Sequence, residues 1–374
     1  MKPVRPETIA AQALHAIDEP TGAVVPPIHL STTYARDASH ALRGRTYTRD
    51  ENPTPVTAER VLAALEGGAA ALTFASGMAA ATAAIRAALR PGDHVISPRV
   101  AYFALRSWLD RFCQRWGVHH DVVDTTDPAA VQAAMRPTTR LVWCETPANP
   151  TWEITDIAAI AEIAHAGGAL LAVDSTCGTP VHTQPIALGA DLVMHAATKY
   201  LAGHSDVLAG ALVTARADAT WEQIALLRHD EGAVLGPFEA YLLMRGMRTL
   251  FARVERSSRT AHYLATELAG RGVTVRYPGL PSHPQHAVAA RQMQHGFGGM
   301  LSVQVGGGAA RAIEVVKRLQ IWVPATSLGG VESLVEHRHS VEGPTTPTPP
   351  DLLRLSVGLE HEADLLDDLV AALS

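Results

Sequence analysis

Short apolar runs alternate with longer helix-like segments from Pro55 to about residue 236. This alternation implies right-handed βαβ crossovers and a mostly parallel sheet that is covered by helices on both faces. Seven apolar runs are predicted to be strands, at Ala71–Phe74, His94–Ser97, Asp121–Val123, Leu141–Cys144, Leu170–Val173, Leu192–His195 and Ala211–Thr214. The predicted helices include Val56–Leu65, Met78–Leu89, Ala129–Met135 and Ile157–His165. We therefore predict an α/β fold with a seven-stranded sheet.

The length of the chain, 374 residues, exceeds the usual size of a single core, so two domains are expected. Residues 1–50 are rich in Pro, Thr and His and are predicted to form an extended arm, followed by a sheet-bearing domain at 51–236. A helical stretch from Pro237 to Leu268 leads into a smaller α+β domain at 237–374, and the proline-rich segment Gly343–Pro350 is predicted to be a surface linker. The later elements predicted in this domain are the strands Met300–Val305 and Leu353–Val357 and the helices Ala309–Leu319 and Glu362–Leu373.

Charge and cysteine content argue against several classes of protein. The net charge is −6 and the chain has no block of Lys and Arg, which argues against a partner made of nucleic acid or anionic membrane. Cys113, Cys144 and Cys177 are odd in number and widely separated, so they suit a reducing cytoplasm better than a disulfide framework or a zinc ribbon. The first residues lack a secretion signal, and no histidine pair has the carboxylate support of a metal site. We expect a cytoplasmic protein that acts on small molecules and contains no metal.

Reactive side chains are expected beyond the carboxyl ends of the predicted strands. Lys199 follows the strand Leu192–His195 and is flanked by small residues, where its ammonium can lose hydration and become a neutral amine that condenses with an aldehyde. Asp174 ends the strand Leu170–Val173, where its carboxylate can face a pyridine nitrogen and keep it protonated. Either residue alone is better explained as a surface lysine or a strand-end aspartate. Together they favour pyridoxal phosphate as cofactor.

The phosphate of such a cofactor needs a site of its own. The segment Phe74–Met78 reads as a strand-to-helix turn, whose free amide groups and positive dipole end can receive a dianion. Gly77 and Met78 are the predicted phosphate-binding residues. Considered alone, this segment is better explained as an ordinary helix entry with glycine at its tight turn.

These motifs, in their order along the chain, resemble the Cys/Met-metabolism family of pyridoxal phosphate enzymes. The family includes cystathionine γ-synthases, cystathionine γ- and β-lyases, methionine γ-lyases and homoserine sulfhydrylases. The resemblance runs from Thr21-Gly22-Ala23-Val24-Val25-Pro26-Pro27-Ile28 to Leu353-Arg354-Leu355-Ser356-Val357-Gly358-Leu359-Glu360. It implies the fold-type-I architecture of pyridoxal phosphate-dependent transferases and at least a homodimer, and it suggests a homotetramer.

The resemblance also implies roles around the cofactor. Tyr47 and Arg49 match the tyrosine and arginine that reach the phosphate of the neighbouring subunit, and Thr198 matches a hydroxyl in the phosphate cradle. Tyr102 matches a tyrosine that stacks on the cofactor ring and transfers protons. The chain departs from the family at Ala196, where a serine is usual, and directly after Tyr102, where Phe103 replaces the first residue of Gly-Gly-Thr. The loss of a charge-assisted hydrogen bond at Ala196 costs roughly 1.5–3 kcal/mol if nothing replaces it.

Three further residues are implied to hold the substrate. Arg354 matches the arginine that pairs with the α-carboxylate, Asn149 matches an amide that bonds the cofactor oxygen or this carboxylate, and Ser327 begins another family motif. Thr326 stands where relatives differ and substrate choice is influenced. It matches neither the acidic residue of cystathionine-handling members nor the valine of methionine lyases.

The implied chemistry begins with removal of the Cα proton by Lys199, with Lys199 and Tyr102 relaying protons afterwards. The leading expectation is cystathionine γ-synthase-like replacement on an activated homoserine by cysteine, within transsulfuration and methionine biosynthesis. The alternatives are elimination, as in cystathionine γ- or β-lyase or methionine γ-lyase, and a catalytically weak protein that only binds pyridoxal phosphate. An aminotransferase would use the same lysine and aspartate but would conserve the substrate nitrogen.

Overall fold

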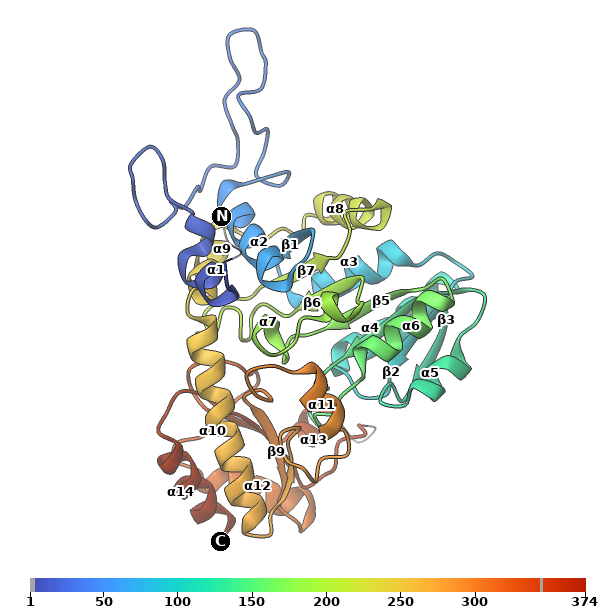
Figure 1. Ribbon diagram of the computed structural model, residues 1–374, viewed down its shortest axis with the longest axis vertical. Coiled ribbons are helices and arrows are strands. Elements are labelled where there is room, and N and C mark those ends of the chain that lie inside the picture. The colour runs from blue at the N-terminus through green and yellow to red at the C-terminus, as the bar shows by residue number, and fades with distance from the viewer. Residues whose placement is uncertain (1–3, 344–345) are drawn as a thin grey trace.

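The computed structural model describes residues 4–343 and 346–374 and contains two β-sheets (Figure 1). The strands of the first sheet lie in the order β1-β7-β6-β5-β4-β2-β3. The strands from β2 to β6 pair in parallel, whereas β7 is antiparallel to both β6 and β1. The sheet comprises β1 (Ala70–Phe74), β2 (His94–Pro98), β3 (His119–Val123), β4 (Thr139–Glu145), β5 (Leu170–Asp174), β6 (Leu192–His195) and β7 (Gly210–Thr214). The predicted α/β class and the mostly parallel seven-stranded sheet are confirmed.

Helices cover both faces of this sheet, as the uninterrupted apolar character of its strands predicts. In β4, Leu141 and Trp143 belong to the core under α3, α4 and α8, whereas Val142 and Cys144 belong to the core under α5 and α6. The helices of this part are α2 (Pro53–Glu66), α3 (Gly77–Ala88), α4 (Phe103–Trp116), α5 (Pro128–Ala134), α6 (Ile157–Ala166), α7 (Thr179–His182) and α8 (Ala219–Glu231), with a 3₁₀ turn at Pro185–Leu188.

The second sheet has the order β10-β11-β12-β9-β8 and belongs to the C-terminal part of the chain. Its strands are β8 (Thr274–Arg276), β9 (Met300–Gln304), β10 (Val323–Pro324), β11 (Leu334–Glu336) and β12 (Leu352–Ser356). The helices of this part are α10 (Leu250–Gly270), α11 (His286–Gln292), α12 (Gly308–Arg318), α13 (Arg338–Glu342) and α14 (Glu362–Leu373). The sequence does not indicate β8, β10 or β11, because runs of two or three residues carry no readable alternation.

The helical stretch predicted from Pro237 to Leu268 is two helices in the structure. α9 (Pro237–Met247) ends before Arg248 and α10 begins at Leu250. Gly246 lies so close to the loop after β6 that an added Cβ would stand 2.2 Å from the carbonyl oxygen of Ala202. The carbonyl of Gly246 also accepts a hydrogen bond from the Arg253 guanidinium at 2.7 Å. The break therefore brings α9 against the loop that carries Lys199.

The N-terminal segment begins with a short helix, α1 (Pro6–Gln12), followed by a 3₁₀ turn at Ala13–His15, which the prediction of an extended arm did not include. From there to Pro53 the chain forms two loops that project from the body (Figure 1). The divisions at residues 50 and 236 stay predictions. Residues 344 and 345 of the predicted surface linker lie outside the described residues, and Thr348 of the same segment is buried rather than exposed.

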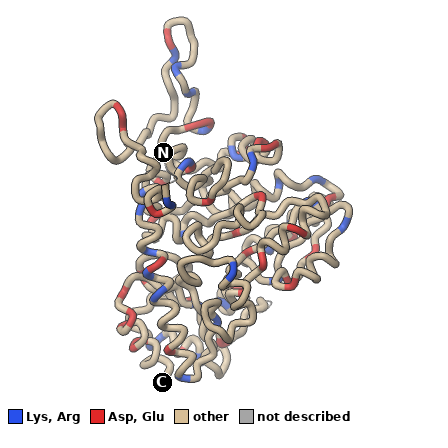
Figure 2. Tube along the Cα trace, in the orientation of Figure 1, with Lys and Arg blue, Asp and Glu red and all other residues tan. Residues whose placement is uncertain are grey.

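Figure 2 shows acidic and basic residues interspersed along the trace rather than gathered by sign. In the part of the chain that the structure describes, no helix is both long and apolar enough to cross a membrane.

Gly210, at the start of β7, gives a test of how the sheet positions the turn before α3. A Cβ at this position would stand 2.1 Å from the carbonyl oxygen of Ser76, so Gly210→Ala must displace that turn. We expect a loss of about 1–3 kcal/mol in the free energy of unfolding, measured by thermal or urea denaturation. Gly270→Ala is the matched control, because nothing lies within 4 Å of its added Cβ. Equal stability of the two variants would contradict this account of the turn.

Candidate active site

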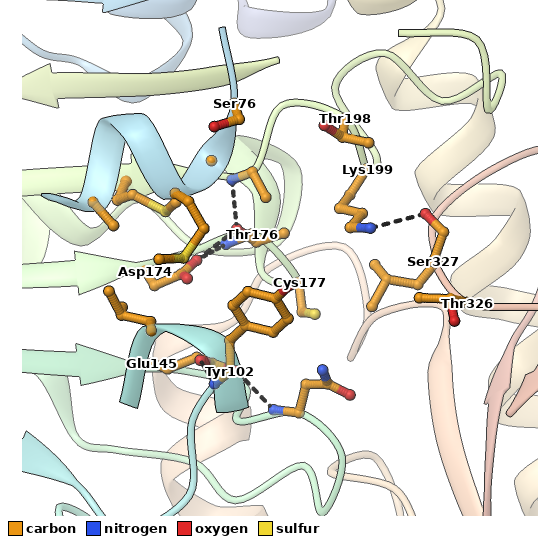
Figure 3. A pocket seen from close by; sticks show the side chains of 18 of the residues that line it. Ser76, Tyr102, Glu145, Asp174, Thr176, Cys177, Thr198, Lys199, Thr326 and Ser327 are labelled. Atoms are coloured by element: carbon orange, nitrogen blue, oxygen red, sulfur yellow. Dashed lines mark hydrogen bonds between the residues drawn. The ribbon is translucent and has the colours of Figure 1, made fainter. Parts of the chain in front are cut away.

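A cavity of about 220 Å³ opens at the carboxyl ends of β4, β5 and β6 and is closed from the other side by the C-terminal part (Figure 3). Most residues predicted for the site line it. These are Gly77, Met78, Tyr102, Asn149, Asp174, Thr198, Lys199, Ser327 and Arg354. The cavity is also lined by Thr326, which the sequence marks as a position that influences substrate choice, and by five residues that were not predicted for the site: Ser76, Glu145, Thr176, Cys177 and Arg338.

Lys199 extends into the cavity from the loop after β6. Its Nζ donates a hydrogen bond to Oγ of Ser327 at 2.8 Å, and Figure 3 shows the two side chains pointing toward each other. Burial lowers the pKa of the Lys199 amine, and the positive charge of Arg354 lowers it further. A larger fraction of this amine is therefore neutral near pH 7 than for an exposed lysine.

Asp174 is the last residue of β5 and is buried. Its Oδ1 accepts hydrogen bonds from the backbone amide of Thr176 at 3.0 Å and from the Thr176 hydroxyl at 2.5 Å. Burial raises the pKa of Asp174, while the bonds from Thr176 oppose this rise. The carboxyl group lines the cavity, as does Tyr102 (Figure 3).

The turn before α3 presents the amide groups expected for a phosphate site. Ser76 is the N-cap of this helix, and its Oγ accepts from the Ala79 amide at 3.1 Å, which leaves the hydroxyl hydrogen to donate. An added Cβ at Gly77 would lie 2.9 Å from the Cβ of Ala196, so the turn and the strand end are in close contact. Ser76 therefore offers a hydroxyl donor near the position where Ala196 has none.

Thr198 is tied to the backbone rather than free. Its Oγ1 donates to the Ala209 carbonyl at 3.1 Å and accepts from the Ala209 amide at 3.0 Å. The hydroxyl that the sequence assigns to the phosphate cradle thus stabilises the loop on which Lys199 stands.

Glu145 holds two of the predicted residues in place. It ends β4 directly beside Asp174 on β5, and its carboxyl oxygens accept from the backbone amides of Tyr102 at 2.7 Å and Asn149 at 3.0 Å. Burial, and then the nearby charge of Asp174, raise the pKa of Glu145 to about 8. Its position at the end of a central strand, like that of Asp174, was a signal that the sequence contained.

Arg354 reaches the cavity from β12 of the second sheet. Its Nη2 contacts the Ser327 carbonyl and a Glu336 carboxyl oxygen, each at 2.6 Å, and its Nη1 donates to Oδ1 of Asn149 at 3.4 Å. Its Nε is buried and has no hydrogen-bond partner among residues 4–343 and 346–374. Burial lowers the pKa of Arg354 to about 10. The Nε–H of this guanidinium is thus a buried donor without an acceptor among the described residues.

Tyr47 and Arg49 do not reach this cavity within their own chain. The Arg49 guanidinium carbon lies 5.9 Å from the centre of the Tyr47 ring, and Arg49 lines a separate cleft with Glu59 and Arg228. The turn at Ser76–Met78 and the facing Ala196 and Thr198 bring no cationic side chain.

The match to a family model decides which protein family the chain belongs to. Residues 7–374 match the model of the family described as Cys/Met metabolism PLP-dependent enzyme. The chain belongs to this family. Its cofactor is therefore pyridoxal phosphate, and the residues present fit that group, because a buried lysine amine, a strand-end carboxyl and a helix N-terminus meet in one cavity.

Individual relatives agree with this assignment. The chain is 48% identical to the cystathionine gamma-synthase of Mycobacterium tuberculosis, with 98% of this chain and 96% of the relative covered. It is 40% identical to the cystathionine beta-lyase of Coxiella burnetii, over 98% and 97% of the two chains. The solved cystathionine gamma synthase of Xanthomonas oryzae pv. oryzae, in complex with aminoacrylate and cysteine, superposes with a TM-score of 0.95 at 38% identity and covers 100% of this chain and 98% of its own. The predicted fold-type-I architecture is confirmed.

The lowered pKa of Lys199 predicts a pH dependence. The rate at which cofactor-free protein binds pyridoxal phosphate should rise with pH as the amine loses its proton, with a midpoint below pH 10.5, the ordinary pKa of lysine. Arg354→Gln removes a positive charge that disfavours the protonated amine, so the midpoint should move to higher pH. The exposed Arg271→Gln is the control and should leave it unchanged. Stopped-flow absorbance measures the rate, and a midpoint that Arg354→Gln moves downward would refute this explanation.

Proposed function

We propose that the protein is a cystathionine γ-synthase-like enzyme of transsulfuration and methionine biosynthesis. It replaces the γ-acyloxy group of an activated homoserine by the thiol of cysteine, so that a C–O bond breaks, a C–S bond forms, and the acyl group leaves as a carboxylate. The observation that supports this choice is the 48% identity, over nearly the whole chain, to a cystathionine gamma-synthase.

The roles of the cavity residues are part of this proposal. Bound pyridoxal phosphate supplies an acceptor for the electron pair left at Cα. Lys199 removes the Cα proton with its neutral amine, and Asp174 holds a proton on the ring nitrogen beside it. Tyr102, with its backbone fixed by Glu145, relays protons with Lys199. The backbone amides of Gly77 and Met78 receive the phosphate, and Thr198 shapes the loop that faces them.

The substrate α-carboxylate is held by Arg354, with Asn149 and Ser327 beside it. The unpartnered Nε of Arg354 supports this role, since a buried donor without a partner is costly unless a ligand completes it. Ser327 now accepts a hydrogen bond from the Lys199 amine, and its Oγ loses this partner when that amine turns to the cofactor.

Elimination is the second candidate, as in cystathionine γ- or β-lyase or methionine γ-lyase. Two observations support elimination as an alternative. The chain is 40% identical to a cystathionine beta-lyase, and Thr326, which lines the cavity, does not match the acidic residue of cystathionine-handling relatives. A weak pyridoxal phosphate-binding protein is the third candidate, because Ala196 brings no hydroxyl to the turn.

A substrate panel separates these candidates. Purified holoenzyme is incubated with an O-acylhomoserine plus cysteine, and separately with cystathionine, and the products are followed by mass spectrometry and an oxo-acid assay. We expect cystathionine from the first mixture and slow oxo-acid release from the second. Rapid oxo-acid release from cystathionine, together with no formation of cystathionine from the O-acylhomoserine and cysteine, would instead establish elimination. Lys199→Ala is the control and should lower either rate by at least about a hundredfold.

We also propose that the enzyme is cytoplasmic and is a homodimer at least, with a homotetramer as its full assembly. The three cysteines are buried and unpaired, which suits a reducing compartment. Tyr47 and Arg49 stand on the projecting arm, away from the cavity of their own chain, and the Ser76–Met78 turn lacks a cation. A second copy of the chain that brings Tyr47 and Arg49 to this turn completes the site.

Mixing two inactive variants tests the composite site. Lys199→Ala and Arg49→Ala are co-expressed, so that half of the randomly formed dimers are hybrids and each hybrid has one intact site. We expect about a quarter of the parental activity, because the Lys199 of one chain then works with the Arg49 of the other. Co-expression of Lys199→Ala with Asp174→Asn is the control and should restore nothing, since both residues belong to the same chain's cavity. Equal failure of both mixtures would argue against an arm donated by the partner.

A further inference from the structure

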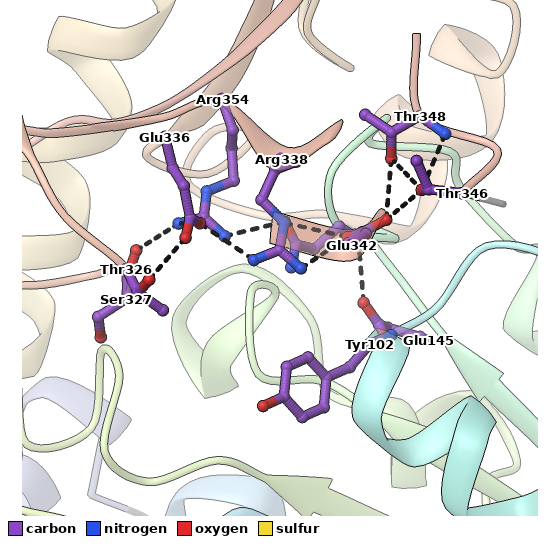
Figure 4. A network of polar contacts seen from close by, with 11 residues as sticks. Tyr102, Glu145, Thr326, Ser327, Glu336, Arg338, Glu342, Thr346, Thr348 and Arg354 are labelled. Atoms are coloured by element: carbon purple, nitrogen blue, oxygen red, sulfur yellow. Dashed lines mark hydrogen bonds and ion pairs between the residues drawn. The ribbon is translucent and has the colours of Figure 1, made fainter. Parts of the chain in front are cut away.

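Arg338 lies in the cavity and takes no part in the roles proposed above. It is the first residue of α13, and only 2% of it is exposed. Its Nη1 donates to Oε2 of Glu336 at 3.0 Å, and its Nε and Nη2 donate to Oε1 of Glu342 at 3.0 and 2.6 Å (Figure 4). The ring of Phe103, the first residue of α4, lies 5.4 Å from its guanidinium carbon. Arg338 is therefore a fixed and fully buried charge.

The charge of Arg338 is stable where it lies. Burial opposes it, but Glu336 and Glu342 raise the pKa of Arg338 above its usual value. In contrast, burial lowers the pKa of Arg354 to about 10. Of the two neighbouring guanidinium groups, Arg338 is the one with two carboxylate partners.

Glu336 connects the two arginines. One of its oxygens, Oε2, contacts both Arg338 and Arg354, and the other accepts from the Thr326 hydroxyl at 2.7 Å (Figure 4). A single carboxylate charge is thus divided between two guanidinium groups. Arg354 is only partly neutralised, and its Nε stays without a partner.

We propose that Arg338 is a positioning residue for the α-carboxylate of the amino-acid substrate, because it competes for Glu336 and so keeps the charge of Arg354 available to that carboxylate. This inference rests on the proposed role of Arg354. Without Arg338, Glu336 would pair with Arg354 alone, and Glu342 would be left as an uncompensated negative charge nearby. Both changes oppose the entry of a carboxylate.

Glu342 should act in the opposite direction. Its carboxyl group bonds Arg338 and the hydroxyls of Thr346 and Thr348, and it makes no hydrogen bond or ion pair with Arg354. When the charge of Glu342 is removed, Glu336 is the one carboxylate partner left to Arg338, and the two pair more strongly. Arg354 is then freed further for the substrate.

Calorimetric titration of the holoenzyme with glycine and with glycinamide tests the inference. The two ligands have the same amine but only glycine has a carboxylate, and neither carries a β- or γ-leaving group. Relative to the parent, Arg338→Met should weaken glycine binding about tenfold and leave glycinamide within about twofold. Glu342→Gln should bind glycine at least as tightly as the parent does. If Arg338→Met yields no folded holoenzyme, Arg338→Lys serves in its place, with a smaller loss in the same direction, because one ammonium cannot match both carboxylates.

Either of two results with the variants overturns the inference. One is that the Arg338 variant weakens glycine and glycinamide equally, as a purely structural defect would. The other is that Glu342→Gln weakens glycine binding as much as the Arg338 variant does. A parent enzyme that binds glycine no better than glycinamide would contradict the carboxylate role of Arg354 itself, and with it this inference.

Discussion

The removal of the Lys199 amine from water is the constraint on which the rest of the site depends. The strand ends of the first sheet alone would leave this lysine at an open edge, and the second sheet closes over it. Buried hydrogen bonds hold the two parts together, because Trp152 Nε1 donates to Ser302 Oγ at 2.8 Å and Ser302 donates to the Pro150 carbonyl at 2.7 Å. These contacts place Asn149 next to Arg354 and keep the amine in a cavity where burial lowers its pKa.

Closing a cavity over an amine also buries the charges that bind an amino acid, and the structure compensates them locally. Glu145 accepts two backbone amides, and Glu336 is shared by Arg338 and Arg354. Buried ion pairs add little net stability when desolvation is counted, but they fix the geometry of the groups they join. The same network therefore fixes where Tyr102 and Arg354, to which we assign the substrate carboxylate, stand relative to Lys199.

The sequence indicates those features of the fold that arise from a repeated pattern of strands and helices along the chain. The strand periodicity predicts the first sheet, and it places Asp174 and Lys199 at strand ends where parallel strands gather reactive groups. The family motifs add Arg354 and Asn149. The same pattern also indicates Glu145, since this residue ends β4 as Asp174 ends β5.

Other features depend on contacts that no local pattern encodes. Arg338 starts a five-residue helix, and its contact with Phe103 spans both parts of the molecule. The break between α9 and α10 depends on the fit of Gly246 against Ala202, and the hydroxyl of Thr198 is directed by Ala209 on the far side of its loop. Each is decided by tertiary packing.

The central claim is that one amine carries the cofactor, and the composition of the chain makes it unusually easy to test. The sequence contains three lysines, Lys2, Lys199 and Lys317, and Lys317 is exposed on α12. Reduction of the holoenzyme with borohydride, followed by proteolysis and mass spectrometry, locates the lysine that becomes covalently attached to pyridoxal phosphate. We predict that the modification lies on the peptide that contains Lys199, and its presence on either of the other two lysines alone would contradict the central claim.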